Sequence, residues 1–283
     1  MWAKTDNNNN IVLYHPLLYH LLDVAAVAGT YWDECLDSTV RRRLEASLGC
    51  DARSCVLFFA GAHDIGKASP FFQNRVPEIA RHTELPFPQN ALNRPHGFIS
   101  TKVLRDVLPR RPDLRLLSRI TGGHHGIFPR AMNLEMGADT LGNDYWNRAR
   151  REILDEFAHT VGFDLTQCNG DVPEISDATL VPVLAGFISV VDWIGSNQDF
   201  FPCESQCGCP LPYTTAEYWE LARKRSKSAL ETLGWLPAVS FTTEAAFDGV
   251  FRGFTPNALQ STALSLASLQ TGPYLMIIEA PMG

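Results

Sequence analysis

The sequence lacks the features that would place it in or across a membrane. Its N-terminus, MWAKTDNNNN, is polar and has no apolar segment of the kind that a signal peptide requires. The most apolar long window, Thr179 to Gly195, is slightly short for a membrane span and contains Asp192. We therefore expect a cytoplasmic protein without a membrane partner, in which this window forms a buried helix.

A disulfide framework and a strongly basic composition are also missing. The seven cysteines are odd in number and belong to a chain of 283 residues, which argues against a set of structural disulfides. The stretch CESQCGC, Cys203 to Cys209, could bind zinc, but no second cluster completes four ligands, so free thiols are the better interpretation. With a formal net charge of −7, any contact with nucleic acid needs local basic patches. The runs Arg41–Arg43 and Arg223–Lys227 are candidates, although each is also typical of a solvated helix face.

What the sequence does contain is helical periodicity over most of its length. Apolar residues recur at helical spacing, serine or threonine precedes two of the periodic segments, and glycine follows several of them. The predicted helices are His15–Leu36, Ala52–His63, Pro95–Val107, Asp113–Gly122, Asn143–Gly162, Ser176–Asn197 and Thr214–Gly234. The fold class is therefore predicted to be all-α.

The pattern changes after about Leu236. The segment Phe254–Gln270 predicts one short helix, and GPYLMIIEAPMG, Gly272–Gly283, contains the one convincing strand of the sequence. A lone strand cannot satisfy its own backbone hydrogen bonds, so we expect that the natural protein continues or that this tail is poorly ordered. The run of four asparagines near the N-terminus is also expected to be disordered.

Histidine and aspartate occur at a few unusual places. His63 and Asp64 end an apolar run and are followed by Gly66 and Lys67. Buried carboxylates are costly unless they are paired or bind a metal. The other candidates also lie inside apolar helices or at their glycine-marked ends, and they are His20, His96, His124, His125 and Asp192. Imidazole with carboxylate suits first-row transition metals, and two cations that share Asp64 would suit a phosphodiester displacement.

Each of these residues also has an ordinary interpretation. Taken alone, His20 or His96 is more simply a structural core histidine. The doublet His124–His125 between glycines and the pair His63–Asp64 are harder to explain that way. His15, His82 and His159 lie in polar or terminal contexts and are predicted to be surface residues. Asp23, one turn after His20, is either a partner that orients its imidazole or a solvated charge.

Together these motifs resemble the HD superfamily of metal-dependent phosphohydrolases. The order YHLLDVAAVA, FFAGAHDIGK, TGGHHG and DWIGS is more closely similar to the HD nuclease domain of the CRISPR-associated nuclease-helicase, the effector of type I systems, with subtype I-E nearest. The tail IIEAPMG resembles the strand and the opening of a helicase Walker A loop, which would run on through lysine and threonine. The resemblance implies an HD-type helical bundle with a metal site in its core over residues 1–235. Residues 236–283 would be a linker and the truncated edge of a RecA-like helicase domain.

The resemblance also implies the ligands and the chemistry. One metal would be held by His20, His63, Asp64 and Asp192, and a second by Asp64, His96, His124 and His125. Two divalent ions (Mn, Fe, Co, Ni or Mg) would activate water to cleave single-stranded DNA as an endonuclease in CRISPR antiviral defence. Lys67 would lie near the scissile phosphate, and Gln260 matches the adenine-reading glutamine of the helicase. ATP is not expected to bind or turn over here, because the rest of the Walker A loop is missing. The implied partners are single-stranded DNA, the CRISPR surveillance complex (Cascade) and inhibitor proteins.

Substrate contacts and competing functions remain open at the sequence level. Ser189 and Ser196 flank Asp192 and could contact a phosphate, although helix-capping or back-bonding roles are equally ordinary. Phe71, Phe72 and Trp193 adjoin metal ligands and could stack on bases, but core positions are favoured for them. The alternatives are a nucleotide phosphohydrolase that acts on small molecules and a non-catalytic module that docks on the surveillance complex.

Overall fold

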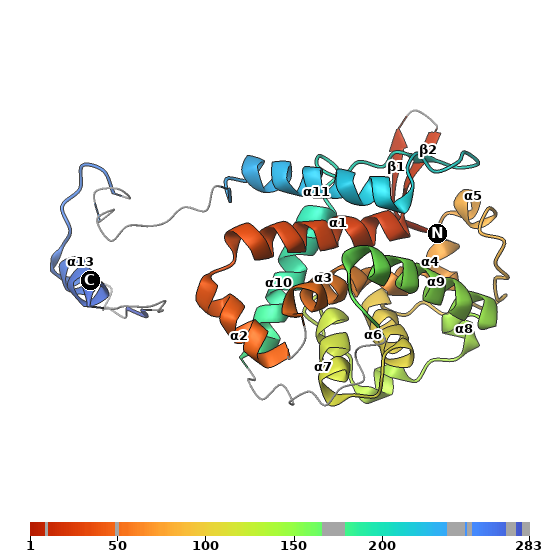
Figure 1. The fold of residues 1–283 in the computed structure, drawn as a ribbon, viewed down its shortest axis with the longest axis horizontal. Helices are drawn as coiled ribbons and strands as arrows, with labels where there is room; N and C mark the ends of the chain where they lie inside the picture. Colours follow the sequence, from red (N-terminus) through yellow and green to blue (C-terminus); the bar gives the residue numbers. More distant parts are fainter. Residues whose placement is uncertain are drawn as a thin grey trace. The chain divides into compact units, whose positions relative to one another are not determined.

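The computed structural model describes residues 1–8, 11–48, 51–165, 179–236, 247, 251–269 and 276–278. The chain divides into two compact units, Met1–Pro237 and Ala238–Gly283. The first unit is a helical bundle with a small sheet at one edge, and it carries every residue of the predicted metal site (Figure 1).

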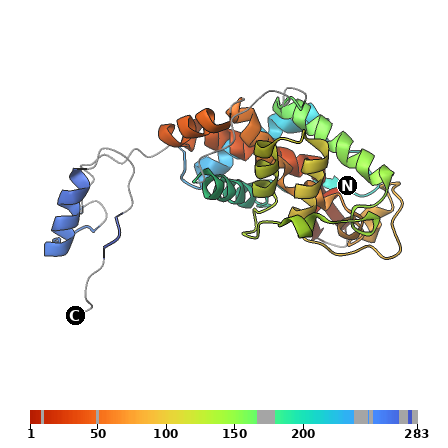
Figure 2. The same ribbon diagram turned by 90° about the horizontal axis from the view of Figure 1, so that it is seen from below.

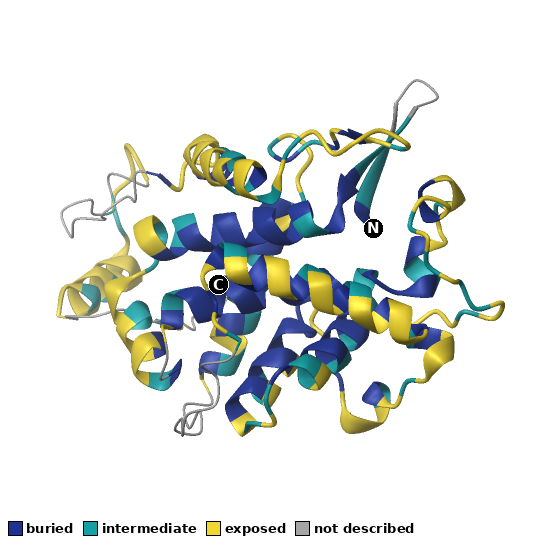
Figure 3. Cartoon of the chain, turned by 45° about the vertical axis from the view of Figure 1, so that its right-hand side comes forward, coloured by how far each residue is buried: buried dark blue, intermediate teal, exposed yellow. Residues whose placement is uncertain are grey.

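Helix α1 (Leu17–Thr30) forms the centre of the first unit. Every residue from Leu21 to Gly29 is buried, because the helix is apolar on nearly all sides. It packs against α3 (Ala52–Gly61), α10 (Leu180–Gly195) and α11 (Thr215–Thr232), and Figure 3 shows it almost entirely buried. Because so many elements contact α1, a ligand that it carries is held firmly by its surroundings.

The remaining helices surround this centre. In both ribbon views α6 (His96–Val107) and α7 (Pro112–Thr121) lie side by side (Figures 1 and 2). The side chain of Asn143 caps the start of helix α9 (Asp144–Val161). The helix ends at Gly162, whose φ of 75° is a left-handed conformation that favours glycine. The Thr214–Glu217 capping box begins α11. The shorter elements are the π-helical turn Tyr31–Cys35, α2 (Ser38–Leu48), α4 (Pro70–Gln73), α5 (Pro77–Ala80), α8 (Ala138–Leu141) and the 3₁₀ segments Ala62–Lys67 and Ala131–Leu134.

The prediction of a predominantly helical fold is confirmed, but the expectation that the N-terminal region has no strand is wrong. β1 (Trp2–Asn8) pairs antiparallel with β2 (Ile11–Pro16), and β2 pairs with β3 (Ser205–Gln206). Asn7 and Asn8 belong to β1, so they are not disordered, while residues 9 and 10 lie outside the described residues. The strands escaped prediction because they are short and polar, and because β3 lies almost 200 residues away in sequence.

The second unit contains helix α13 (Ala258–Ser268), which begins at an Asn257–Gln260 capping box. The strand predicted near the C-terminus is not found in residues 276–278, the part of it that the structure describes. These residues have no strand partner among the described residues, and a strand needs one to satisfy its backbone. The Walker A opening at residues 279–283 and the predicted cap at Ser176 lie outside the described residues.

Two other predictions concern membrane-spanning helices and the cysteines. Within the described part of the chain, no helix is both long enough and apolar enough to cross a membrane. Cys203 is buried, Cys207 is half-buried and Cys209 is exposed, and none of the three forms a disulfide. The groups of possible metal ligands in the described residues include no cysteine, so the structure does not support a zinc site in CESQCGC.

The contact between α1 and α3 leads to a prediction about stability. A Cβ added at Gly61 would lie 2.7 Å from the carbonyl oxygen of Leu21 and 2.3 Å from the ring of Phe157. We expect Gly61→Ala to lower the free energy of unfolding by about 1–3 kcal/mol, as overpacking of a core does. Urea unfolding measures this change.

Gly186 on α10 is the matched control, because a Cβ there meets no atom within 4 Å. Gly186→Ala should leave stability unchanged or raise it by up to about 1 kcal/mol, since alanine is the better helix former. Equal effects of the two substitutions would contradict the close approach of α1 and α3.

Candidate metal centre

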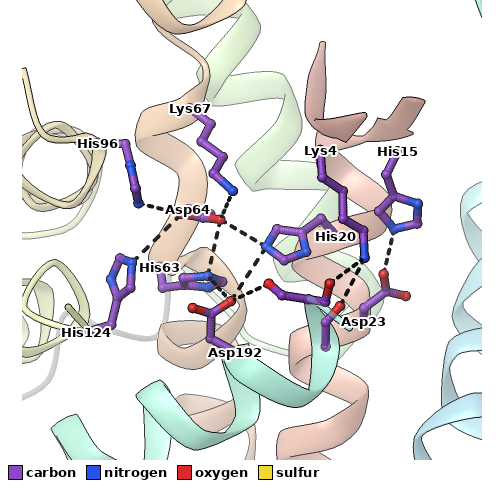
Figure 4. A network of polar contacts seen from close by, with 12 residues as sticks. Lys4, His15, His20, Asp23, His63, Asp64, Lys67, His96, His124 and Asp192 are labelled. Carbon is purple, nitrogen blue, oxygen red and sulfur yellow. Dashed lines mark hydrogen bonds and ion pairs between the residues drawn. The ribbon is translucent and has the colours of Figure 1, made fainter. Parts of the chain in front are cut away.

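Five separate segments bring their polar side chains to one place in the core (Figure 4). His20 comes from α1, and His63 and Asp64 come from the 3₁₀ segment that directly follows α3. His96 is the first residue of α6, His124 and His125 follow α7, and Asp192 lies in the last turn of α10. The predicted ligands are thus neighbours in space although they span more than 170 positions of sequence.

The side chains form two groups, in each of which the potential ligand atoms lie within 4.8 Å of one another. One group is His20, His63, Asp64 and Asp192, and the other is His96, His124 and His125. We call them the aspartate group and the histidine group. The aspartate group is buried throughout, whereas His125 in the histidine group is exposed.

Asp64 faces both groups with different oxygens. Its Oδ2 lies 2.9 Å from Nε2 of His20, and its Oδ1 lies 3.1 Å from Nε2 of His96 and 3.9 Å from Nε2 of His124. Within the histidine group, Nε2 of His125 lies 3.0 Å from Nε2 of His96. Asp64 is therefore placed where one carboxylate can serve two cations.

Several of these atoms are buried without a hydrogen bond, which is the expected state of metal ligands. They are Nε2 of His63, Oδ1 of Asp64 and Nε2 of His124. Nε2 of His63 does lie 3.1 Å from Oδ1 of Asp192, as an ion pair when the imidazole is protonated. An unsatisfied buried polar atom costs about 1–3 kcal/mol, so three in one place call for a partner such as a cation.

The positions of the protons on His63 and His124 also suit the binding of a metal cation. Nδ1 of His63 lies 2.9 Å from the carbonyl of Ala60, and Nδ1 of His124 lies 2.8 Å from the carbonyl of Thr121. A carbonyl only accepts, so each Nδ1 carries a proton and donates it. In the neutral ring this leaves the Nε2 lone pair directed into the centre, as metal-ligating histidines require. The residues present therefore fit a transition-metal site.

Electrostatics in the centre favour ionised carboxylates. Burial raises the pKa of Asp64, but Lys67, His63 and His96 outweigh it and hold this pKa well below its usual range. Burial likewise raises the pKa of Asp192, but the charge of His63, its contact with Asp192 and the charge of His20 together outweigh burial and hold this pKa below its usual range. Both carboxylates are thus charged and available as ligands.

The histidines divide into protonated and neutral ones. Burial lowers the pKa of His20 to about 3 and that of His124 to about 3. Burial also lowers the pKa of His63, but Asp64 and Asp192 outweigh it and raise this pKa to about 10. In the metal-free protein, His63 therefore carries the proton that neutralises part of the charge of the two carboxylates.

The turn that carries Asp64 is fixed by close contacts on several sides. A Cβ at Gly66 would lie 2.0 Å from the carbonyl oxygen of His96, so only glycine allows this approach to α6. The Gly66 amide donates to Oγ of Ser100 at 2.8 Å. The carbonyl of Lys67 accepts from Gln73 at 2.9 Å, and the carbonyl of Ala68 accepts from Arg150 at 2.8 Å. Sequence reasoning did not single out Gln73 or Arg150, because their roles depend on tertiary contacts.

Of the other predicted site residues, Lys67, Ser189 and Ser196 lie close to the ligands, whereas Gln260 belongs to the second unit. Nζ of Lys67 lies 2.6 Å from Oδ2 of Asp64. Ser189 donates to the carbonyl of His124 at 2.6 Å, and Ser196 donates to Oδ1 of Asp192 at 2.8 Å. Both hydroxyls thus have internal acceptors, and their phosphate contacts stay predictions. Gln260 lies in the second unit, where its side chain accepts from the amide of Asn257.

The interpretation of Trp193 as a core residue is wrong. Its side chain is 71% exposed, while Asp192 beside it is buried. Phe71 and Phe72 are half-buried. The apolar character of α10 on all sides gave no indication of which face is exposed.

The prediction that His15 lies on the surface is also wrong. His15 is buried, and its Nε2 lies 2.6 Å from Oδ2 of Asp23. Tyr218 donates to Oδ1 of Asp23 at 2.8 Å, so Asp23 is neither solvated nor bonded to His20. His15 lies in β2, whose last two residues are buried, and that strand was not predicted. His82 and His159 are exposed, as predicted.

Most side chains of the two basic runs bind partners within the first unit. Arg41 on α2 binds the carbonyl of Asp33 at 3.2 Å, and Arg225 on α11 binds Glu204 at 2.6 Å. Arg223 binds Glu220, and Lys227 lies 3.7 Å from Glu34. These contacts favour the interpretation of both runs as ordinary helix faces.

A helical domain built around buried histidines and an adjacent His–Asp pair defines the HD class of metal-dependent hydrolases. The family model described as Cas3, HD domain, matches residues 2–201, and the chain belongs to that family. The resemblance and the HD-type bundle inferred from sequence are confirmed. The family is CRISPR-associated, and its known members include nucleases.

Individual relatives agree with this assignment. The CRISPR-associated endonuclease/helicase Cas3 of Thermus thermophilus is 30% identical over 298 residues, which cover 100% of this chain and 30% of that protein. The crystal structure of the Thermus thermophilus Cas3 HD domain in the presence of Ni²⁺ matches with a TM-score of 0.56 at 26% identity, over 80% of this chain and 88% of that one. A chain in a structure described as a CRISPR RNA-guided surveillance complex, pre-nicking, matches with a TM-score of 0.60 at 25% identity, over 96% of this chain and 31% of that one. The present chain spans about a third of the length of the curated relatives it matches.

The proton on His63 leads to a prediction about metal binding. A cation that binds through His63 must displace this proton. We expect Ni²⁺ binding to release about one proton from His63. The apparent affinity should then fall about tenfold for each pH unit as the pH is lowered, because protons compete with the metal. Calorimetry in buffers of different ionisation enthalpy counts the released protons.

His159→Ala is the control, because this histidine is exposed and lies outside both ligand groups. It should leave the proton count unchanged. Affinity independent of pH, with no proton released, would contradict the charge state assigned to His63.

Proposed function

We propose that this chain is a metal-dependent endonuclease that cleaves single-stranded DNA in type I CRISPR interference. The observation that carries the proposal is the position of Asp64 between two groups of ligands, with Lys67 beside it. Two divalent cations held by these groups would activate water, orient the scissile phosphate and neutralise the charge that develops on it.

The chain's own residues provide binding and orientation. Asp64 is positioned to bridge the two groups, and His20, His63 and Asp192 would complete the coordination on one side. His96, His124 and His125 would complete it on the other. The ammonium of Lys67 neutralises Asp64, and the lysine side chain is 16% exposed, so it could donate to a phosphate oxygen that enters from solvent.

Access to the centre supports a polymeric substrate. His125 of the histidine group is exposed and His96 is partly exposed, and the exposed Trp193 directly follows Asp192 in sequence. A single strand presents unpaired bases that can stack on an aromatic ring, which a duplex does not. Trp193 is therefore proposed as a stacking platform beside Asp192.

The cellular role follows from the relatives and is part of the proposal. A relative of this chain is a nuclease/helicase, and a structural match comes from an assembly described as a surveillance complex. We infer that the chain acts with such a complex, and that helicase activity belongs to a part of the protein beyond the HD domain. Small-molecule hydrolysis and pure docking are the competing functions, and the assay below distinguishes all three.

Loss of Asp64 should abolish cleavage. We expect Asp64→Ala to reduce nicking of circular single-stranded DNA by about three orders of magnitude or more, since both ligand groups lose their shared carboxylate. The assay uses the EDTA-treated protein with Mn²⁺ or Ni²⁺ added back, and circular dichroism verifies the helical fold.

Nucleotides and cyclic dinucleotides serve as parallel substrates, and His159→Ala serves as the control. Cleavage at the wild-type rate in the Asp64 variant would contradict the assignment of the centre. Hydrolysis of nucleotides but not of DNA would indicate a small-molecule phosphohydrolase. Absence of hydrolysis in the metal-loaded wild type, with retained binding to a surveillance complex, would indicate a docking module.

Loss of the exposed indole should weaken substrate binding and not the fold. We expect Trp193→Ala to raise KM for single-stranded DNA about 5- to 100-fold with little change in kcat, because base stacking contributes about 1–3 kcal/mol. Tyr145→Ala is the matched control, because Tyr145 is also exposed but lies on α9 outside the ligand groups. Equal KM values for the Trp193 variant and the wild type would exclude Trp193 as a stacking platform.

A further inference from the structure

Strand β1 brings the side chain of Lys4 to the C-terminal end of α10. Its Nζ donates to the carbonyl of Phe201 at 2.9 Å, to that of Ser196 at 3.3 Å and to that of Gly195 at 3.5 Å. Figure 4 shows this ammonium close to the metal centre, beside Asp23 and His15. Every hydrogen bond that the structure describes for this ammonium therefore goes to a backbone carbonyl at the end of α10 or just beyond it.

This position is favourable for a cation and acts on a metal ligand. The last carbonyls of a helix lack intrahelical partners and carry its partial negative charge, so a lysine there stabilises the final turn. That turn contains Asp192. Ser196 links the two residues, because its carbonyl accepts from Lys4 while its hydroxyl donates to Oδ1 of Asp192 at 2.8 Å.

The same strand also holds the turn that carries Lys67. The backbone amide of Trp2 donates to Oε1 of Gln73 at 3.0 Å, and Nε2 of Gln73 donates back to the carbonyl of Trp2 at 2.8 Å. Nε2 of Gln73 also donates to the carbonyl of Lys67 at 2.9 Å. Strand β1 therefore contacts two sides of the aspartate group. Lys4 fixes the end of α10 that carries Asp192, and Trp2 fixes, through Gln73, the turn that carries Asp64 and Lys67.

The third side is fixed through the sheet. β1 pairs with β2 in a register that sets Lys4 opposite His15, and β2 leads directly into α1, which carries His20. β1 is thus connected, by hydrogen bonds or by strand pairing, to every segment that supplies a ligand to the aspartate group.

We propose that β1 braces the aspartate group and that Lys4 is a positioning residue for Asp192. Lys4 acts through the end of α10 and through Ser196 and is not itself a ligand. The proposal rests on the metal centre described above. It predicts that Lys4 affects metal binding in the aspartate group selectively and leaves the histidine group unchanged.

The test measures Ni²⁺ binding to EDTA-treated protein by calorimetry, without any nuclease assay. Lys4→Met keeps an apolar stem and removes the donors. We expect it to weaken one class of Ni²⁺ site about 10- to 100-fold, the usual effect of losing a residue that orients a ligand, and to leave the other class within about twofold. Lys4→Arg, which restores donors and charge, should recover most of the affinity.

Three further variants identify the affected class of site and exclude a general effect on the protein. Asp192→Asn should weaken the same class, and the double variant should lose less than the product of the two single effects, because both act on one ligand. Lys227→Met removes an exposed lysine of α11 that pairs with Glu34, and it should change neither class.

The outcomes separate this proposal from the proposed function. Unchanged Ni²⁺ binding in Lys4→Met would overturn it, as would equal weakening of both classes together with a lower melting temperature of the metal-free protein. Strictly multiplicative effects of Lys4→Met and Asp192→Asn would overturn it too. A wild-type protein that binds two Ni²⁺ but cleaves no DNA would refute the nuclease function and leave the role of Lys4 intact.

Discussion

The carboxylate of Asp64 is buried, and the cost of burying its charge determines how its neighbours are arranged. Lys67 lies 2.6 Å from one oxygen, His20 lies 2.9 Å from the same oxygen, and His96 lies 3.1 Å from the other. These contacts keep the group ionised but leave Oδ1 without a hydrogen bond. Because Nε2 of the neutral His124 also has no hydrogen bond, and Nε2 of His63 can bind a metal once its proton leaves, the site is organised in advance for cations.

The rest of the fold holds these ligands at fixed distances. α1 is buried over most of its length, Asp192 lies in the last turn of α10, and the Asp64 turn packs so closely on α6 that only glycine fits at position 66. The small sheet extends this support to the surface of the bundle. Flexible loops could not keep a buried cluster of like-charged and oppositely charged groups in register, so the metal chemistry and the helical packing depend on each other.

Sequence reasoning identified the helices and the ligand candidates because the signals are local. His63–Asp64 ends an apolar run, and His124–His125 lies between glycines, so each motif is visible within a few positions. The N-terminal sheet, Lys4, Gln73, Arg150 and the buried pair His15–Asp23 were missed because their roles come from pairings distant in sequence. Trp193 was misplaced because a helix that is apolar all round has no periodicity to show which face meets solvent. The ligand set implied by the resemblance comes together in space.

The claim on which this account depends is that Asp64 is shared by two cations. Anomalous X-ray diffraction from crystals grown with Ni²⁺ tests it most directly, because the anomalous signal comes from the metal and not from the light atoms of the protein. We expect two anomalous peaks about 3.5–4 Å apart, one bounded by His20, His63 and Asp192 and the other by His96, His124 and His125, with Asp64 bound to both. A single peak, or two peaks of which only one contacts Asp64, would contradict it.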